Sequence, residues 1–191
     1  RVKAFDTRPI VKEQVESLGA EFVSLETSEE AQTTGGYAEE MSEDFYQHEH
    51  AIISEHLPTT DAVITTAQIF GKRAPLLITE EMVQTMRYGS VIVDLAAEQG
   101  GNCELTVPGK SVERHGVNIL SPLDLPSSLS YHTSEMFSRN VTALLTEMLN
   151  AGELNIDLED EVVNGTMLTH EGKIMNQHVI DLLERDKEEN S

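Results

Sequence analysis

Residues 89–103 read GSVIVDLAAEQGGNC, and this stretch decides how the chain is built. Val91 to Leu95 is a short run that is almost continuous in apolar residues, which is typical of a strand with both faces buried in a parallel sheet. Gly89 ends the amphipathic segment before this run, and the glycine pair at 100–101 gives a tight, polar turn after it. The stretch therefore predicts an inner parallel strand with a polar turn at its carboxyl end.

Apolar runs and amphipathic segments alternate on both sides of this strand. Further strands are predicted at 2–5, 21–25, 62–66 and 117–120, and helices at 9–18, at 38–56, after the cap Thr79 and after the cap Ser134. This alternation implies an α/β fold with a mostly parallel sheet and right-handed crossovers. Ligands of such sheets bind beyond the carboxyl ends of the strands, so the residues just after each strand are the candidates for a site.

Length and composition limit the domain organisation and the partners. The 191 residues fit one main domain, placed at 1–150, followed by an acidic segment at 151–191 in which Asn164-Gly165 predicts a short hairpin over 162–168. Acidic residues outnumber basic ones by 34 to 13, and the resulting net charge of −21 argues against a nucleic-acid partner. The single cysteine excludes an internal disulfide, and no apolar stretch approaches the roughly 20 residues that span a bilayer.

The first candidate segment, Asp6-Thr7-Arg8, follows the first predicted strand. In a dinucleotide-binding unit, an acidic residue at the end of the second strand accepts hydrogen bonds from the adenosine ribose hydroxyls. An aspartate at this place favours NAD, because it repels the extra phosphate of NADP. The alternative from the residues alone is an ordinary turn or helix-capping aspartate.

Two loops carry residues suited to a flat ligand. Gly36 and Tyr37 follow Gly35 and would give a mobile hinge whose ring folds over a ligand, the alternative being an ordinary loop. Thr65 and Thr66 end the strand at 62–66 and Ala67 and Gln68 follow it, at a place where small residues let a cofactor approach the backbone. Lys72 and Arg73 follow and would neutralise phosphate or an acidic partner, or form a solvated basic turn.

The turn after the inner strand carries Asn102, next to the two glycines, and Glu98. Backbone groups of this turn could form hydrogen bonds with the carboxamide of a ligand, and Glu98 could act as an acid or base. The alternative is a purely structural turn. None of the seven histidines has the spacing of a zinc site, and Cys103 has no triad partner in sequence. No catalytic residue and no metal ligand are predicted.

Five strings in order resemble one family. They are Ala4-Phe5-Asp6-Thr7-Arg8-Pro9, Gly35-Gly36-Tyr37-Ala38-Glu39-Glu40-Met41-Ser42, Thr65-Thr66-Ala67 with Gly71-Lys72 and Ala74-Pro75, Gly89 to Glu98 with Gly100 to Cys103, and Asp124-Leu125-Pro126-Ser127. Together they look like the NAD(H)-binding domain of proton-translocating nicotinamide nucleotide transhydrogenase, alpha-subunit type, with alanine dehydrogenases as more distant relatives. The resemblance runs from Val2 to about Leu149 and more weakly through 162–174.

The resemblance implies a function and a set of site residues. Such a domain binds NAD(H) and exchanges a hydride with NADP(H) on a separate domain, while membrane subunits couple the exchange to proton movement. It implies that Asp6, Thr7 and Arg8 hold the adenosine ribose, that Gly36 and Tyr37 close over the nucleotide, and that Ala67 and Gln68 line the cofactor. The chain departs from the family at Gln68, where an aliphatic residue is usual, and at Arg73, where proline is usual.

The family's glycine-rich phosphate loop and its first nucleotide-fold strand have no counterpart in the 191 residues. The expected fold is therefore a partial Rossmann-like, doubly wound parallel sheet that lacks its first strand and its glycine-rich loop. In the strand order 3-2-1-4-5-6 that missing strand lies in the middle. We expect either a collapsed pairing between the strand at Val2 and the strand at Ile64, or an open slot between them, and the abrupt start suggests a fragment.

Two other functions stay open from the sequence. One is an alanine-dehydrogenase-like enzyme, with Glu98 as the candidate acid or base; the other is a non-catalytic acidic interaction module that has lost nucleotide binding. If the chain belongs to a transhydrogenase, the resemblance implies three partners: the NADP(H)-binding domain, the membrane subunits and a second copy of the domain. The implied location is peripheral, on the cytoplasmic face of the inner membrane or on the matrix side of a mitochondrion.

Overall fold

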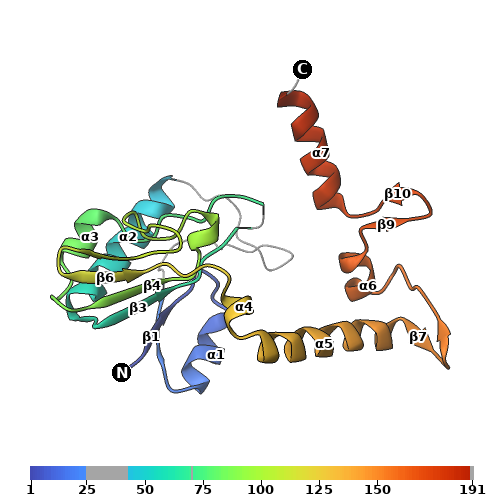
Figure 1. Ribbon diagram of the computed structural model, residues 1–191, viewed down its shortest axis with the longest axis horizontal. Helices are drawn as coiled ribbons and strands as arrows, with labels where there is room; N and C mark the ends of the chain where they lie inside the picture. The colour runs from blue at the N-terminus through green and yellow to red at the C-terminus, as the bar shows by residue number, and fades with distance from the viewer. Residues whose placement is uncertain (25–42, 70, 190–191) are drawn as a thin grey trace. The chain divides into compact units, whose positions relative to one another are not determined.

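The computed structural model describes residues 1–24, 43–69 and 71–189 (Figure 1). These residues form two compact units, Arg1–Asp124 and Leu125–Ser191, which are described separately below. The compact units thus divide after Asp124, whereas the sequence placed the end of the main domain at residue 150. The region from 125 to 150 is mainly one long helix, which belongs with the C-terminal segment by its contacts.

A four-stranded sheet forms the centre of the first unit. Its order is β3 (Ala62–Thr65), β4 (Val91–Asp94), β6 (Val117–Leu120) and β5 (Ser111–Arg114). The first three strands are parallel, and β5 joins β6 in an antiparallel hairpin. The strands at 91 and 117 and the parallel pairing confirm the sequence prediction. The prediction missed β5, because this edge strand has one apolar residue, Val112, among Ser111, Glu113 and Arg114.

The core of the first unit packs between this sheet and two helices, α2 (Glu43–His56) and α3 (Glu80–Gln84). The buried cluster comprises Leu57, Ile78, Met82, Val83, Met86, Ile92, Cys103, Val117 and Ile119. Thr79 caps α3 as predicted, with its hydroxyl accepting a hydrogen bond from the Met82 amide at 3.3 Å. Short 3-10 turns, η1 (Leu57–Thr59) and η2 (Ala97–Gln99), follow α2 and β4.

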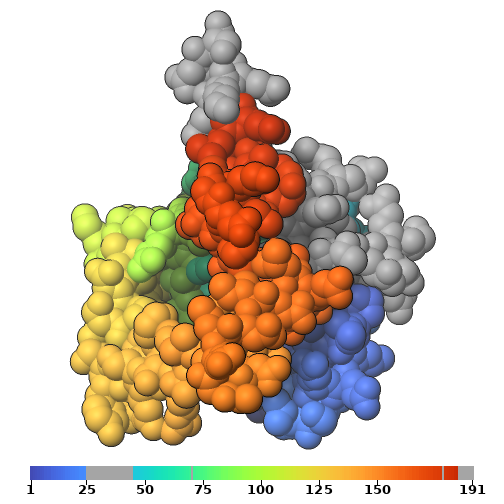
Figure 2. All heavy atoms as spheres, turned by 90° about the vertical axis from the view of Figure 1, so that its right-hand side faces the viewer, coloured from blue at the N-terminus to red at the C-terminus, as the bar shows by residue number. Residues whose placement is uncertain are grey.

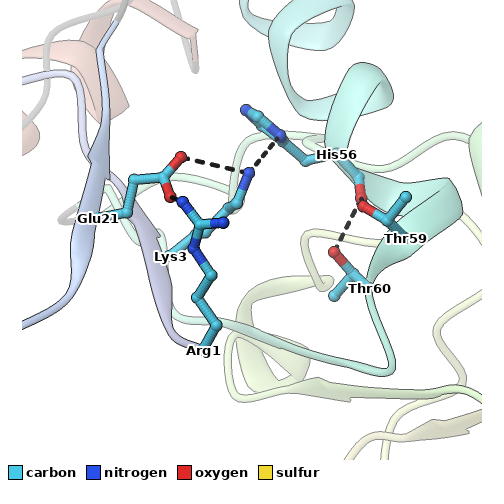
Figure 3. Close-up of polar contacts among 6 residues, drawn as sticks. All are labelled: Arg1, Lys3, Glu21, His56, Thr59 and Thr60. Atoms are coloured by element: carbon cyan, nitrogen blue, oxygen red, sulfur yellow. Dashed lines mark hydrogen bonds and ion pairs between the residues drawn. The ribbon is translucent and has the colours of Figure 1, made fainter.

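The chain begins with a parallel pair, β1 (Lys3–Phe5) and β2 (Glu21–Val23), connected by α1 (Val11–Ser17). Figure 3 shows how polar side chains link this pair to the end of α2. The Lys3 ammonium lies 3.3 Å from the Glu21 carboxylate and 3.2 Å from His56 Nδ1, and Arg1 also contacts Glu21. These exposed contacts fix β1 near α2 without adding much stability.

In the part of the chain that the structure describes, β1 pairs only with β2. Within the same residues, strand β3 pairs only with β4, which has β6 on its other side. The collapsed pairing of the Val2 and Ile64 strands was therefore the wrong alternative. Val2 and Ile64 are 68% and 67% exposed, so neither edge strand is covered along these side chains. Among the described residues, each of these two strands is therefore an edge strand of its own sheet.

Glu49 is an acid on the apolar face of α2, one turn after the buried Phe45, and only 4% of it is exposed. Burial raises the pKa of its carboxyl from an ordinary 4.5 to about 7. The folded chain thus keeps this proton up to about pH 7, whereas the unfolded chain releases it near pH 4.5. The free energy of unfolding should consequently fall as the pH rises between these two values.

Glu49→Gln should remove the fall in the free energy of unfolding with rising pH, because the amide carries no charge to bury. We expect a stabilisation on the order of 2 to 3 kcal/mol at pH 8 and little change at pH 4, measured by urea unfolding. Glu55→Gln, at an exposed position of the same helix, is the matched control and should change neither value. An equal gain at both pH values would show that burial of charge is not the cause.

The second unit, gold to red in Figures 1 and 2, consists of one long helix, the short elements before and after it and a C-terminal helix. They are α4 (Leu125–Ser128), α5 (Ser130–Glu147), β7 (Leu149–Asn150), β8 (Glu153–Leu154), α6 (Glu161–Thr166), β9 (Thr169–His170), β10 (Lys173–Ile174) and α7 (Gln177–Glu189). The long helix begins four residues before its predicted cap, Ser134. Its apolar residues Tyr131, Met136 and Phe137 are about two-thirds or more exposed.

The predicted hairpin over 162–168 is wrong. Residues 161–166 form α6, because the Asp160 carboxylate accepts hydrogen bonds from the amides of Val162 and Val163 and starts a helix there. The hairpin of this region lies instead at β9–β10, where Glu171 and Gly172 have φ values of +47° and +78° and make the two-residue turn. The sequence signal at Asn164-Gly165 was overridden by the cap that precedes it.

Candidate functional site

The carboxyl ends of β3, β4 and β6 meet at one edge of the four-stranded sheet, because the three strands are parallel. A shallow hollow of about 490 Å³ opens beyond this edge, and its lining combines small, apolar and acidic residues: Ala97, Glu98, Gly100, Pro108, Leu123 and Asp124. All six follow β4 or flank the β5–β6 hairpin. Open α/β sheets bind ligands at this kind of place, so the hollow and its surroundings form the candidate site.

Asp94, the last residue of β4, is fully buried and organises the turn beneath the hollow. Its Oδ1 accepts hydrogen bonds from the Thr65 hydroxyl and the Ala96 amide, both at 3.1 Å. Its Oδ2 accepts from the Asn102 amide at 2.8 Å, the Cys103 amide at 3.1 Å and the Thr106 hydroxyl at 2.5 Å. Five donors thus surround one carboxylate, which compensates its removal from water.

Gly101 is required by this arrangement. It has a φ of +84°, and a Cβ at this position would lie 2.6 Å from Asp94 Oδ2 and 2.7 Å from Thr106 Cγ2. Glycine is therefore needed both for its backbone conformation and for the close approach of the carboxylate.

Gly101→Ala should consequently destabilise the protein by about 2 kcal/mol more than Gly19→Ala. Gly19 has nearly the same φ, +82°, but no atom of the described residues lies within 4 Å of the place that its Cβ would take, so its substitution reports the conformational cost alone. Thermal or urea unfolding of both variants measures the difference. Equal losses would mean that the loop below Asp94 moves aside at no cost.

Asn102 connects this turn with the segment that follows β3. Its side-chain amide donates to the carbonyl oxygen of Ala67 at 2.9 Å and to that of Pro75 at 2.8 Å, and the residue is fully buried. Its backbone carbonyl accepts from the amides of Leu77 and Ile78 at 2.8 and 3.0 Å. The predicted site residue Asn102 is thus placed under the site, with both amide hydrogens committed to the backbone.

The segment after β3 lies along the same edge. Thr65 is buried against Asp94, whereas Thr66 and Gln68 are exposed and Ala67 is half-buried. The Gln68 amide is 3.4 Å from the carbonyl oxygen of Leu95, which places this unusual glutamine across the turn that follows β4. The exposed Arg73 side chain lies over Gly100, where a Cβ would be 2.8 Å from its Nε.

Glu98 and Asp124 both line the hollow and are joined by a hydrogen bond. The Asp124 amide donates to Glu98 Oε1 at 2.9 Å, and Asp124 has a φ of +54°. This bond closes the end of the β6 segment onto the turn after β4. Glu98 is exposed, so its carboxylate is open to a ligand in the hollow.

Asp6 and Arg8 form a compact pair at the end of β1. Asp6 Oδ1 accepts from the Arg8 amide at 2.9 Å and from Arg8 Nε at 3.0 Å, and Oδ2 accepts from Arg8 Nη2 at 3.0 Å. Burial by itself raises the pKa of Asp6, but the hydrogen bonds and positive charge of Arg8 outweigh this effect and lower it. Asp6 is therefore an anion at neutral pH with a fixed orientation, and Thr7 lies half-buried between the two.

The structure brings together two groups of the predicted site residues. Thr65, Thr66, Ala67, Gln68 and Asn102 share the carboxyl edge of the four-stranded sheet, and Asp6, Thr7 and Arg8 lie at the end of β1 in the other sheet. Gly36 and Tyr37 lie outside the described residues. The sequence prediction did not single out Pro108 and Leu123 of the hollow. No sequence signal marks them, because they reach the hollow only when the β5–β6 hairpin that they flank has formed.

Neither a metal centre nor a membrane span is present among residues 1–24, 43–69 and 71–189. No group of three or more His, Cys, Asp or Glu residues in these ranges is arranged to hold a metal ion. No helix in the same ranges has the length and apolar character needed to cross a bilayer.

Comparison with known proteins gives matches over most of the chain. The family model described as alanine dehydrogenase/PNT, C-terminal domain, matches residues 1–177. The NAD(P) transhydrogenase subunit alpha of Cereibacter sphaeroides is 49% identical over 177 residues, which cover 90% of this chain and 34% of the relative. The alanine dehydrogenase of Bacillus subtilis is 31% identical over 133 residues, which cover 66% of this chain and 35% of that enzyme.

A solved structure agrees with these sequence relatives. The transhydrogenase from Sinorhizobium meliloti superposes with a TM-score of 0.66 at 38% identity, covering 91% of this chain and 45% of that one. The chain therefore spans less than half the length of these relatives. The topology and this likeness confirm the predicted α/β, Rossmann-like class.

Proposed function

The chain belongs to the alanine dehydrogenase/PNT C-terminal domain family, and from this premise we propose that it is the NAD(H)-binding part of a nicotinamide nucleotide transhydrogenase. In this role it presents NAD(H) for direct hydride exchange with NADP(H) held by another domain. The observation that supports the proposal is that residues predicted for the site follow the carboxyl ends of parallel strands: Asp6 after β1, and the Thr65–Gln68 segment at the end of β3.

The two groups of site residues correspond to the two halves of a dinucleotide. The end of β1 offers an ionised, oriented Asp6 to the hydroxyls of the adenosine ribose. The edge formed by β3, β4 and β6 offers backbone and small side chains, among them Ala67, Ala97 and Gly100, for close packing against a flat ring. This combination fits NAD(H), and the aspartate supports NAD rather than NADP.

The contribution of this chain to the reaction is binding and orientation. A bound nicotinamide supplies the hydride donor or acceptor, and transfer between two nicotinamides moves no separate proton. The chain therefore needs no general acid or base, and its residues act by fixing the position of one ring face. Asp94 stabilises the turn, and Glu98 anchors the Asp124 segment through the hydrogen bond to its amide.

The partners follow from the same proposal. We expect the chain to meet an NADP(H)-binding domain, to work with membrane subunits that couple hydride exchange to proton movement, and to form homodimers within the complete enzyme. The exposed apolar residues of α5 support contact with another protein surface. The expected location is peripheral to the membrane that holds those subunits.

An alanine-dehydrogenase-like activity is the second candidate, and Glu98 favours it. This exposed carboxylate lines the hollow where a small substrate would meet the nicotinamide, and it could exchange a proton with an imine. Alanine-dependent formation of NADH would support this candidate. An acidic interaction module that has lost nucleotide binding is the third, and it predicts no NADH binding under any condition.

The test is equilibrium binding of NADH, followed by its fluorescence, to the 191-residue chain and to a fusion protein. The fusion joins the chain to the residues of the C. sphaeroides relative that lie outside the matched 34% of that protein. We expect the fusion to bind NADH and to exchange hydride with NADPH once an NADP(H)-binding domain is added. Binding by neither protein would reject nucleotide binding and leave the interaction module. Activity that depends on alanine but not on NADPH would favour the second candidate.

A further inference from the structure

Asn102 has an unusual set of hydrogen bonds for a residue predicted to face a ligand. Its side chain is fully buried, and its two amide hydrogens are directed at carbonyl oxygens that lie 35 and 27 residues earlier in the sequence, those of Ala67 and Pro75. One nitrogen thus holds both ends of the 67–75 segment. The opposite orientation of the amide would point its oxygen at two carbonyl oxygens, so the hydrogen bonds fix which atom is which.

Asn102 also has a buried acceptor atom in its side chain. Its Oδ1 is buried and accepts no hydrogen bond from the residues that the structure describes. An unsatisfied buried acceptor lowers stability, and such groups are rare in folded proteins. The unsatisfied oxygen lowers stability, so we infer that the two hydrogen bonds donated by the same side chain have a role beyond stability.

The position of Ala67 gives the donors such a role. Ala67 lies two residues after the end of β3, on the edge where the nicotinamide half of the nucleotide is expected. Its carbonyl is turned inward and held at 2.9 Å by Asn102, and the Asn102 backbone is held in turn by Asp94 at 2.8 Å. The hydrogen bond from Asn102 thus fixes the position of the backbone at residues 66–68, which forms this part of the surface.

We propose that Asn102 is a positioning residue for the nicotinamide half of the bound nucleotide, acting through Ala67 rather than by contact with the ligand. This inference rests on the proposed function. It predicts a selective effect, because the adenosine half binds at Asp6, on a different sheet that Asn102 does not touch.

Asn102→Ala should weaken binding of NADH about tenfold while changing binding of ADP-ribose, which lacks the nicotinamide, less than about twofold. Titration calorimetry on the fusion protein measures both dissociation constants, and the emission of bound NADH should shift because the ring environment changes. Asn102→Ser, which retains one donor, should fall between the wild type and Asn102→Ala, and it serves if Asn102→Ala does not fold. Ile119→Val, a buried apolar change in β6, is the control for stability and should lower Tm without altering the ratio of the two constants.

Equal weakening of NADH and ADP-ribose, or no weakening by a folded Asn102→Ala protein, would overturn the inference while leaving the proposed function intact. An unmodified fusion that binds neither nucleotide would overturn the proposed function and this inference with it. A change in the ratio for Ile119→Val as large as that for Asn102→Ala would show that loss of stability, and not the position of Ala67, is responsible.

Discussion

Asp6→Ala should reverse the nucleotide preference of the protein. NADH binding should weaken about tenfold to a hundredfold, because the ribose hydroxyls lose a charged acceptor. NADPH binding should strengthen about tenfold, for two reasons: the carboxylate that repels the 2′-phosphate is gone, and the Arg8 guanidinium is released. In the wild type that guanidinium is held by Asp6 through Nε and Nη2, both at 3.0 Å, and it is well suited to grip a phosphate in the same bidentate manner.

The double substitution Asp6→Ala with Arg8→Ala separates these two reasons. It removes the repulsion as well, but it leaves no cation for the phosphate, so the gain for NADPH should largely disappear while NADH binding stays weak. Dissociation constants for NADH and NADPH on the fusion protein, measured at low and at physiological salt, test this. If the double variant binds NADPH as well as the single one, Arg8 takes no part in the selection.

The regular part of this fold could be predicted because it depends on local pattern. The inner strand β4 is marked by its continuous apolar run, and α3 by a threonine cap followed by two acidic residues at its first turn. The edge strand β5 and the helix α6 were not predictable in the same way. The first has too few apolar residues, and the second depends on Asp160, which decides between a turn and a helix for the same Asn-Gly pair.

The site could be predicted only as a set of places along the chain. The strand-end rule located Asp6 and the residues after Thr65, but it could not show that Asp94 would gather donors from Thr65, Ala96 and the 102–106 turn. That arrangement depends on the register of β3 against β4 and on the path of a glycine turn. For Glu49 a signal did exist, since a charged residue interrupts the apolar stripe of α2 between Phe45 and Ile53.

The Asp94 arrangement leads to the second large prediction. Asp94→Ala should lower the free energy of unfolding by about 4 to 5 kcal/mol, because three backbone amides and two hydroxyls lose their acceptor in a buried place. Asp94→Asn should cost about half as much. Its remaining oxygen can still accept from the Asn102 and Cys103 amides, and the hydroxyl of Thr65 can rotate to accept from the new NH₂ group, but the Ala96 amide is left facing another donor.

Asp61 provides the matched control for both substitutions. Its side chain is 86% exposed and lies 3.4 Å from Arg87 in a surface ion pair, so Asp61→Ala and Asp61→Asn should each change stability by about 0.5 kcal/mol or less. Urea unfolding of the four variants in parallel gives the comparison. If the Asp94 variants were no less stable than the Asp61 variants, the turn would have another support, and Asp94 would not be what holds Asn102 and, through it, Ala67 in place.

If Asp94→Asn loses stability as expected but still folds, its ratio of NADH to ADP-ribose binding should move in the same direction as that of Asn102→Ala. Both substitutions weaken the hydrogen bonds that hold the same backbone segment.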